Sequence, residues 1–307
     1  MSAQGGSRAV LAALGANLGI AVIKFIAFAI TSSTSMLAEG VHSLVDSGNQ
    51  GLLLVGARRA NREADEEHPF GYGRDRYVYG FLVALVLFSA GGLFALYEGV
   101  QKIREPHELV SPAVAIIVLL VAIVLESFSL RTAIVESRKV KGAQSWVSFV
   151  RRAKAPELPV VLLEDIAALL GLVFALVGVS LAAATGNPIW DGIGTAAIGV
   201  LLLTVAAVLI IETKSLLIGE AASKSDIATI RSNLLGPGVE RVIHLRTMHL
   251  GPEELLVGAK VAIPASLSSA ELVAAIDEAE SRVRQAVPSA RVIYLEPDLD
   301  RSGAVVP

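Results

Sequence analysis

Four polar side chains recur at helical spacing within an apolar stretch near residues 35–57. They are Glu39, His42, Asp46 and Asn49, in the run AEGVHSLVDSGNQ. At about 100° per residue, all four fall within an arc of roughly 80°, which predicts a single polar face on one helix. His42 and Asp46 are four residues apart, so they are neighbours on that face, as two ligands of one metal ion should be.

A second polar pair, Glu164 and Asp165, interrupts the apolar stretch at residues 159–184. Because the two carboxylates differ by about 100° of rotation, one can face a partner helix while the other points aside. A charge at the centre of a bilayer costs about 2.5 kcal/mol or more, so it is a functional candidate by default. The chain has no cysteine, which leaves carboxylate and imidazole as its strong ligands. Such a set suits zinc, manganese, iron(II) or cobalt.

The same residues have a structural alternative. His42 and Asp46 could form hydrogen bonds between helices that hold a bundle together, and Glu39 and Asn49 could lie at an interface and touch water. Three further acidic residues are expected near segment ends, where water would solvate them: Glu98, Glu126 and Asp191. The HExxH, GxSxG and Walker patterns are absent from the sequence, so no enzyme is predicted.

The composition places these residues in a membrane protein. Apolar residues make up 53% of the 307 positions and charged residues 18%, against about 25% charged in a soluble domain. The mean hydropathy is +0.63. A net charge of −3 disfavours nucleic acid as a partner.

Apolar runs long enough to cross a bilayer predict a bundle of six membrane-spanning helices: Ala9–Ile30, Ser35–Ala57, Tyr77–Val100, Pro112–Thr132, Pro159–Ala184 and Ile189–Ile211. The first is expected to be a retained span and not a cleaved signal. Positive residues gather in the connections at 58–76 and 138–154, whereas 31–34 and 184–187 carry none. This bias predicts that both termini are cytoplasmic.

From residue 213 the pattern becomes charged and periodic, which predicts a transmembrane domain at 1–212 and a soluble domain at 213–307. The expected order of elements in the second domain is helix, strand, strand, helix, strand, typical of a small ferredoxin-like α+β fold. Ser223 or Ser225 is the expected cap of its first helix, and Ser268 with Glu271 resembles a capping box before the second. A domain this small has a modest core, so docking or dimerisation would help it.

Four motifs, SMLAEGVHSLVDSGNQ, HPFGYGRDR, LLEDIAALLG and PGVERVIHLRT, resemble the cation diffusion facilitator family over roughly residues 8–297. The sequence is most similar to the branch that contains the mitochondrial zinc transporter of animals. The resemblance implies a homodimeric, proton-coupled antiporter that exports zinc or a related divalent metal from the cytoplasm by alternating access. Manganese, iron(II) and cobalt are alternative cargoes, and no cofactor is expected. The expected location is the plasma (inner) membrane of a prokaryote.

The resemblance also implies a metal site with two ligands from the second helix and two from the fifth. By position these are His42 and Asp46, then Val161 and Asp165. Because valine cannot bind metal, the fourth ligand stays open among Glu164, Glu39, Asn49 and water. When metal leaves, protons can go to an imidazole, which titrates near neutrality, and to the two aspartates.

Two other metal sites of the family match poorly. In the loop after the second segment, Asp65 and His68 match a site whose second histidine position is Tyr72 here. In the soluble domain, the positions expected to bind metal read Ile243, Ala259, Glu271, Tyr294 and Glu296, so this domain is expected to dimerise without a metal sensor. The alternative function is a membrane metal sensor or metal-dependent channel.

Overall fold

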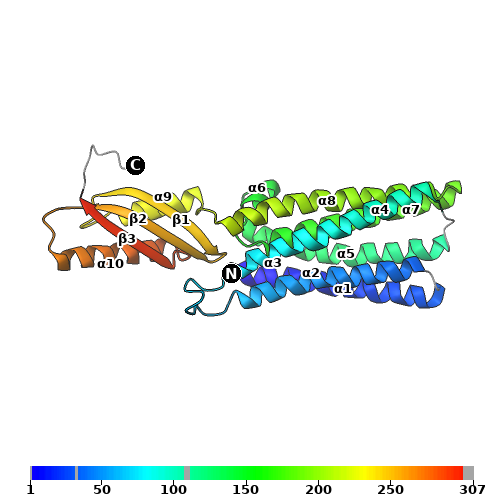
Figure 1. The fold of residues 1–307 in the computed structure, drawn as a ribbon, viewed down its shortest axis with the longest axis horizontal. Helices are drawn as coiled ribbons and strands as arrows, with labels where there is room; N and C mark the ends of the chain where they lie inside the picture. Colours follow the sequence, from blue (N-terminus) through cyan, green and yellow to red (C-terminus); the bar gives the residue numbers. More distant parts are fainter. Residues whose placement is uncertain (1, 32–33, 107–110, 300–307) are drawn as a thin grey trace. The chain divides into compact units, whose positions relative to one another are not determined.

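We describe a computed structural model that covers residues 2–31, 34–106 and 111–299 (Figure 1). The chain divides into two compact units. One comprises Met1–Arg62 and Asp75–Lys214, and the other Glu63–Arg74 and Ser215–Pro307. Positions 32–33 and 107–110, which belong to two of the expected connections, lie outside the described residues.

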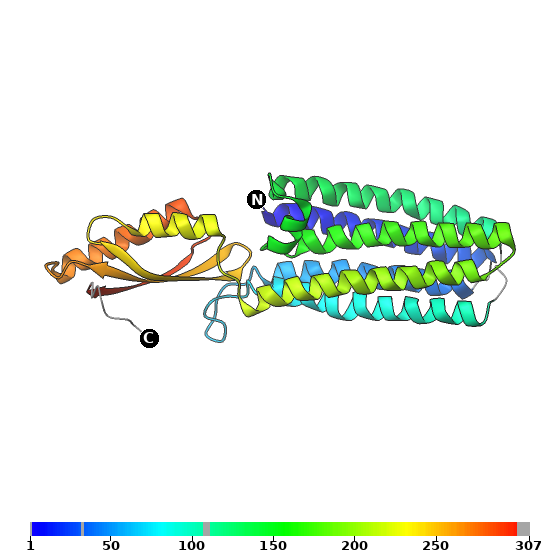
Figure 2. The ribbon, with the colours of Figure 1, turned by 90° about the horizontal axis from the view of Figure 1, so that it is seen from above.

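The first unit is helical, and its long helices run side by side (Figures 1 and 2). Its elements are α1 (Ser2–Thr31), α2 (Thr34–Arg59), α3 (Asp75–Leu82), η1 (Val83–Phe88), α4 (Ser89–Arg104), α5 (Pro112–Lys141), α6 (Trp146–Arg152), α7 (Glu157–Thr185) and α8 (Ile189–Ile218). The π-helical η1 joins α3 to α4 within one continuous span. The short α6 was not predicted. It begins at Ser145, whose hydroxyl accepts a hydrogen bond from the Ser148 backbone amide.

Within the described residues, five helices are long and apolar enough to cross a membrane: Gly6–Ile30, Asp75–Arg104, Pro112–Lys141, Glu157–Thr185 and Ile189–Ile218. The polar positions of the 26-residue α2 make it less apolar than these, and it is not among the five. The helices extend beyond the apolar runs that predicted them, since a helix need not end where the hydrocarbon ends. α5 continues to Lys141, nine residues past the predicted limit at Thr132.

Glycines bring the backbones of α8 and its neighbours close together where α4 ends and α8 begins. A Cβ on Gly99 would collide with the Ala196 backbone, and a Cβ on Gly199 with that of Leu96. On α7, a Cβ at Gly178 would lie 2.8 Å from the Trp190 carbonyl oxygen. Helices in membranes commonly pack closely through such small residues. At the other positions, α1 packs against α2, α5 and α7, and α5 packs against α7.

The second unit contains a three-stranded sheet with two helices on one face (Figure 2). Its elements are α9 (Lys224–Leu234), β1 (Arg241–Gly251), β2 (Glu254–Ile263), α10 (Ser269–Ala286) and β3 (Val292–Leu299). The central β2 pairs antiparallel with β1 and parallel with β3. Alternate residues of β2, from Leu255 through Val257 to Val261, are buried in the core beneath the helices.

The predicted order of elements in this unit is confirmed. Ser223 caps α9 by accepting a hydrogen bond from the Asp226 amide. The capping box of α10 is also present, because the Ser268 hydroxyl accepts from the Glu271 amide and Glu271 accepts from the Ser268 amide. The hydrogen bonds from the Ser268 amide and hydroxyl hold the pKa of the Glu271 carboxyl below its usual value.

The glycine contacts predict a position-specific cost of adding one methyl group. Gly99→Ala should lower the free energy of unfolding in detergent by about 1–3 kcal/mol, because the new Cβ would meet the α8 backbone. Gly15→Ala is the matched control, since no atom lies within 4 Å of a Cβ at that exposed position of α1. There the change should be neutral or stabilising. Equal destabilisation by the two substitutions would show that the packing of α4 on α8 is not the cause.

Candidate metal centre

A chain of polar contacts links α1, α2 and α7 inside the bundle. The amide nitrogens of two α2 residues donate to the Glu164 Oε1 atom on α7, Gln50 at 2.6 Å and Asn49 at 3.3 Å. Asn17 of α1 in turn donates to the Gln50 Oε1 atom at 3.4 Å. Gln50 is fully buried, and Asn49 and Glu164 are nearly so. The structure thus brings together Asn49 and Glu164, two of the predicted site residues, and adds Gln50.

The neighbouring carboxylate of α7 points to a different helix. Asp165 accepts a hydrogen bond at 2.9 Å from the hydroxyl of Ser129 on α5. Only 1% of Asp165 and 2% of Ser129 is exposed. Consecutive residues of α7 therefore face α2 and α5, in keeping with the 100° between successive side chains on a helix.

A third acidic residue on a third helix belongs to the same region. Glu126 of α5 interacts electrostatically with Asp46 and Asp165, and also with Lys24 of α1. The expectation that Glu126 is solvated near a segment end was wrong, since only 2% of it is exposed. The reason is the length of α5, which places Glu126 near the middle of a 30-residue helix. Lys24 is buried as well, and it donates to the Ser43 hydroxyl at 3.2 Å.

Two buried oxygen atoms in this region have no hydrogen-bond donor in the described part of the chain. They are Asn49 Oδ1 and Glu164 Oε2, the second oxygens of side chains whose other polar atoms are bonded to each other. An acceptor buried without a donor costs about 1–3 kcal/mol. Both atoms are therefore available to an electrophile such as a cation.

The other predicted ligands fall differently. Asp46 is half-buried on the same stretch of α2 and interacts with Glu164 as well as with Glu126. His42 and Glu39 belong to α2, but their side chains lie outside the described residues. Among the side chains that are described, no three histidine or acidic residues form a group that could hold a metal ion.

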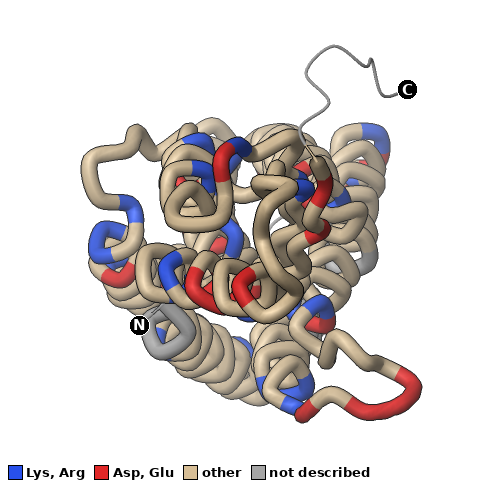
Figure 3. The backbone as a smooth tube through the Cα atoms, turned by 90° about the vertical axis from the view of Figure 1, so that its left-hand side faces the viewer, with Lys and Arg blue, Asp and Glu red and all other residues tan. Residues whose placement is uncertain are grey.

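The predicted loop site lies on the exposed, acidic loop at residues 63–74, seen at the lower right of Figure 3. Both oxygens of Asp65 accept protein hydrogen bonds, one from the His68 amide at 2.7 Å and one from the Tyr72 hydroxyl at 2.6 Å. The His68 ring stacks on Tyr72, with ring centres 4.4 Å apart. Asp65 and His68 are thus brought together, with Tyr72 bonded where the family would have a second histidine.

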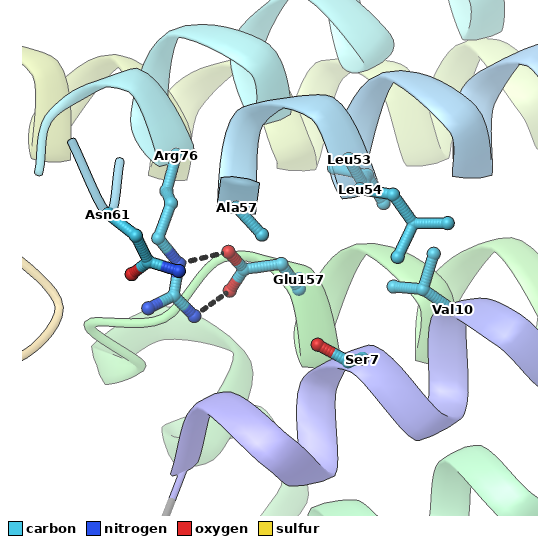
Figure 4. A pocket seen from close by; sticks show the side chains of 8 residues that line it. All are labelled: Ser7, Val10, Leu53, Leu54, Ala57, Asn61, Arg76 and Glu157. Carbon is cyan, nitrogen blue, oxygen red and sulfur yellow. Dashed lines mark hydrogen bonds and ion pairs between the residues drawn. The ribbon is translucent and has the colours of Figure 1, made fainter. Parts of the chain in front are cut away.

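A small cavity of about 60 Å³ lies among α1, α2, α3 and α7 (Figure 4). Its polar lining comes from Ser7, Asn61, Arg76 and Glu157. Arg76 and Glu157 form a two-pronged ion pair, in which Arg76 Nη2 lies 2.8 Å from Glu157 Oε2 and Arg76 Nε donates to Glu157 Oε1. The cavity is therefore bordered by a paired cation and anion.

Residues 10–218 match the family described as "Cation efflux transmembrane domain". The chain belongs to the cation efflux family. It is 32% identical over 243 residues to the human protein named "Proton-coupled zinc antiporter SLC30A9, mitochondrial", covering 78% of this chain and 43% of that protein. It is 32% identical over 254 residues to "Metal tolerance protein C4" of Arabidopsis thaliana, covering 76% of this chain and 55% of that protein.

Similarity also extends over a shorter stretch to bacterial relatives. "Cation-efflux pump FieF" of Klebsiella pneumoniae is 35% identical over 118 residues, which cover 38% of this chain. The chain spans less than half the length of the human antiporter that it matches. The family is one of membrane transporters and not of enzymes, and the resemblance noted in the sequence motifs is confirmed.

Two residues important to this region were not singled out in the sequence, Gln50 and Ser129. Gln50 lies eleven positions after Glu39, which returns to nearly the same helical angle, so extending the polar stripe by one residue would have included it. No comparable signal marks Ser129, because isolated serines are common in membrane helices and usually bond to their own backbone.

Ser129 is predicted to position Asp165 for metal binding. Ser129→Ala should weaken metal affinity by about 10- to 100-fold, as loss of a residue that orients a ligand commonly does. Ser129→Thr should restore much of the affinity, because it keeps the hydroxyl. The control is Ser127→Ala on the exposed side of α5, where the hydroxyl bonds to the Ile123 carbonyl. Titration calorimetry of the purified protein measures all three, and an unchanged affinity in Ser129→Ala would contradict the assignment.

Proposed function

We propose that this protein is a secondary transporter that exports a divalent transition metal, zinc first among the candidates, from the cytoplasm in exchange for protons. The observation that carries the proposal is the group of buried polar side chains on α2, α5 and α7. Asp46, Glu126, Glu164 and Asp165 interact electrostatically, and nearby oxygens of Asn49 and Glu164 lack donors in the described structure. A divalent cation would satisfy both the negative charges and the open acceptors.

The proposed ligands are His42, Asp46 and Asp165, with Glu164, Glu39, Asn49 or water completing the shell. One oxygen of Glu164 is already engaged by Gln50, which leaves Oε2 for the metal. Zinc is supported by the printed function of the human relative, a proton-coupled zinc antiporter. Manganese, iron(II) and cobalt stay alternatives, because oxygen and nitrogen ligands accept all of them. Protons taking the place of the metal on His42 and the aspartates would couple the two fluxes.

The proposal includes an architecture. α2 joins the five apolar helices as a sixth span, whose polar face is turned inward to the site, as charged residues in membranes require. Residues 1–212 form the transport domain, with cytoplasmic termini, and residues 213–307 form a ferredoxin-like domain that dimerises the protein. The plasma membrane of a prokaryote is the proposed location, although the named animal relatives are mitochondrial.

The soluble domain is proposed to lack the family's metal site. Ala259 is buried in the core, and Glu271 is engaged by the α10 capping box. The Glu296 carboxylate lies 3.0 Å from the Lys260 amine, and Asp298 lies 3.1 Å from it. Hydrogen bonds with Glu296 and Asp298 raise the pKa of Lys260. Each of these residues thus has a structural role in place of a ligand role.

A membrane metal sensor or metal-dependent channel is the alternative, since a polar site between helices and a soluble domain would suit either. Metal flux in sealed vesicles separates the three. An antiporter moves metal in response to a pH gradient, a channel moves it without one, and a sensor binds without flux.

The aspartates of the site give the most direct test. Asp46→Ala and Asp165→Ala should each reduce zinc flux by more than about 100-fold, because loss of a direct ligand costs more than loss of a supporting residue. Asp277→Ala, at an exposed position of α10, should leave flux unchanged. Normal flux in the doubly substituted protein would remove this site from consideration. Loss of folding in both variants, seen by size-exclusion chromatography, would favour the structural alternative.

His42 should govern the choice of metal. His42→Asp exchanges a nitrogen ligand for an oxygen, which should shift the preference toward harder ions such as manganese. Competition between zinc and manganese in the flux assay measures the ratio, and His244→Asp in β1, an exposed histidine, serves as control. A ratio unchanged by His42→Asp would place His42 outside the first coordination sphere.

A further inference from the structure

The ion pair between Arg76 and Glu157 is buried although both residues begin a helix. Arg76 is the second residue of α3 and Glu157 the first of α7. Only 10% of the arginine side chain and 4% of the glutamate side chain is exposed. Two parallel hydrogen bonds join them, the arrangement that gives the strongest and most specific pairing of these groups.

The pair lies at the arginine-rich end of the bundle, where α2 ends at Arg58 and Arg59. Next to it is the cavity of about 60 Å³, which Val10 and Leu53 also line (Figure 4). Leu53 follows Asp46 by seven residues on α2, and Glu157 precedes Glu164 by seven on α7. Seven residues are close to two turns, about 10.5 Å, so both helices present the cavity and the candidate metal centre on the same face.

The stretch between the cavity and the metal centre is filled by apolar side chains. Leu53 and Val161 are 2% and 0% exposed and belong to one core cluster. The described structure is therefore closed at this end, with a dry plug inside and an ion pair beside the cavity.

The two ends of the bundle are closed by different kinds of contact. At the end where α8 begins, Gly99, Gly178 and Gly199 bring helix backbones into van der Waals contact. At the opposite end, α3 is joined to α7 by the side chains of Arg76 and Glu157. Side chains can separate without remodelling a helix interface, so this second end is the one built to open.

The energetics of a buried ion pair suit a reversible closure. Burial removes the hydration of both ions, and their attraction roughly offsets that loss. When water enters, each ion regains hydration as the pair separates, and Glu157 keeps a favourable place in the first turn of α7, near the positive end of the helix dipole. The closed and open arrangements can thus lie close in free energy.

We propose that the Arg76–Glu157 pair is the latch of the arginine-rich end of the bundle, and that water and metal enter the cavity from this end only when the pair has separated. The role of such a latch in a transport cycle rests on the proposed function, whereas the closure itself does not.

The natural absence of cysteine makes the latch testable by the accessibility of a single introduced thiol. Val10→Cys places the thiol in the cavity at a position only 1% exposed. In proteoliposomes treated with a charged, membrane-impermeant methanethiosulfonate, labelling should be slow. Arg76→Ala or Glu157→Gln should accelerate it at least tenfold, and the charge exchange of Arg76→Glu with Glu157→Arg should restore slow labelling.

Two controls separate the latch from general loosening. Gln144→Cys, in an exposed connection, should label at one rate in every background. Lys102→Ala breaks an ion pair with Asp191 at the other end and should leave the Val10→Cys rate unchanged. Folding is checked by size-exclusion chromatography, and if Arg76→Ala does not fold, Glu157→Gln and the charge exchange carry the test.

The latch is wrong if folded variants that lack the pair label no faster, if the charge exchange does not restore protection, or if Lys102→Ala accelerates labelling equally. Zinc flux is measured in the same vesicles without the introduced thiol. Absence of flux there would refute the transport proposal and leave the labelling result standing. Normal flux with unaltered labelling would refute the latch alone.

Discussion

Polar side chains buried among apolar helices have no water to bond to, so each must find its partner on a neighbouring helix. This constraint fixes the position of α7. Glu164 is held by Asn49 and Gln50 of α2, and Asp165 by Ser129 of α5. The contacts that orient the candidate ligands are therefore the same contacts that assemble the bundle. A substitution that disturbs the site is expected to disturb helix packing as well, which is why the tests above include folding controls.

The sequence was most informative where a period or a composition shift extended over many residues. Long apolar runs located the helices, and the switch to alternating and capped patterns located β2 and α10 in the soluble unit. The spacing of polar residues on α2 also predicted a common face, and Asn49 does reach Glu164. These features depend on local periodicity, which a single sequence contains.

Features that depend on where a helix ends or on which helix is its neighbour were not predictable. Glu126 seemed close to a span end because the apolar run stops at Thr132, while the helix continues to Lys141. The polar end of α5 gives no hydropathy signal although its backbone is still helical. Arg76 was counted with the positive loop residues, but Glu157 draws it into a buried pair. Such pairings arise from the packing of segments distant in the sequence.

Within the candidate centre, satisfied and unsatisfied oxygens lie on the same side chains. Glu164 presents one oxygen that is held by amides and one that lacks a donor in the described structure, and Asn49 divides its polar atoms in the same way. The bonded atom restricts rotation of the side chain, so the open atom is held in place before any ligand arrives. Binding then costs less conformational entropy than it would for free side chains.

The same economy extends to the ends of the bundle. Separating α4 from α8 at Gly99 and Gly199 would remove backbone atoms from close contact, and that lost dispersion energy is regained only if other atoms fill the gap. Separating α3 from α7 at Arg76 and Glu157 exposes charges that water solvates strongly. Water therefore compensates opening at the arginine-rich end and gives little compensation at the glycine-packed end. If both ends open in turn, the glycine-packed end must do so by a motion that keeps α4 and α8 together.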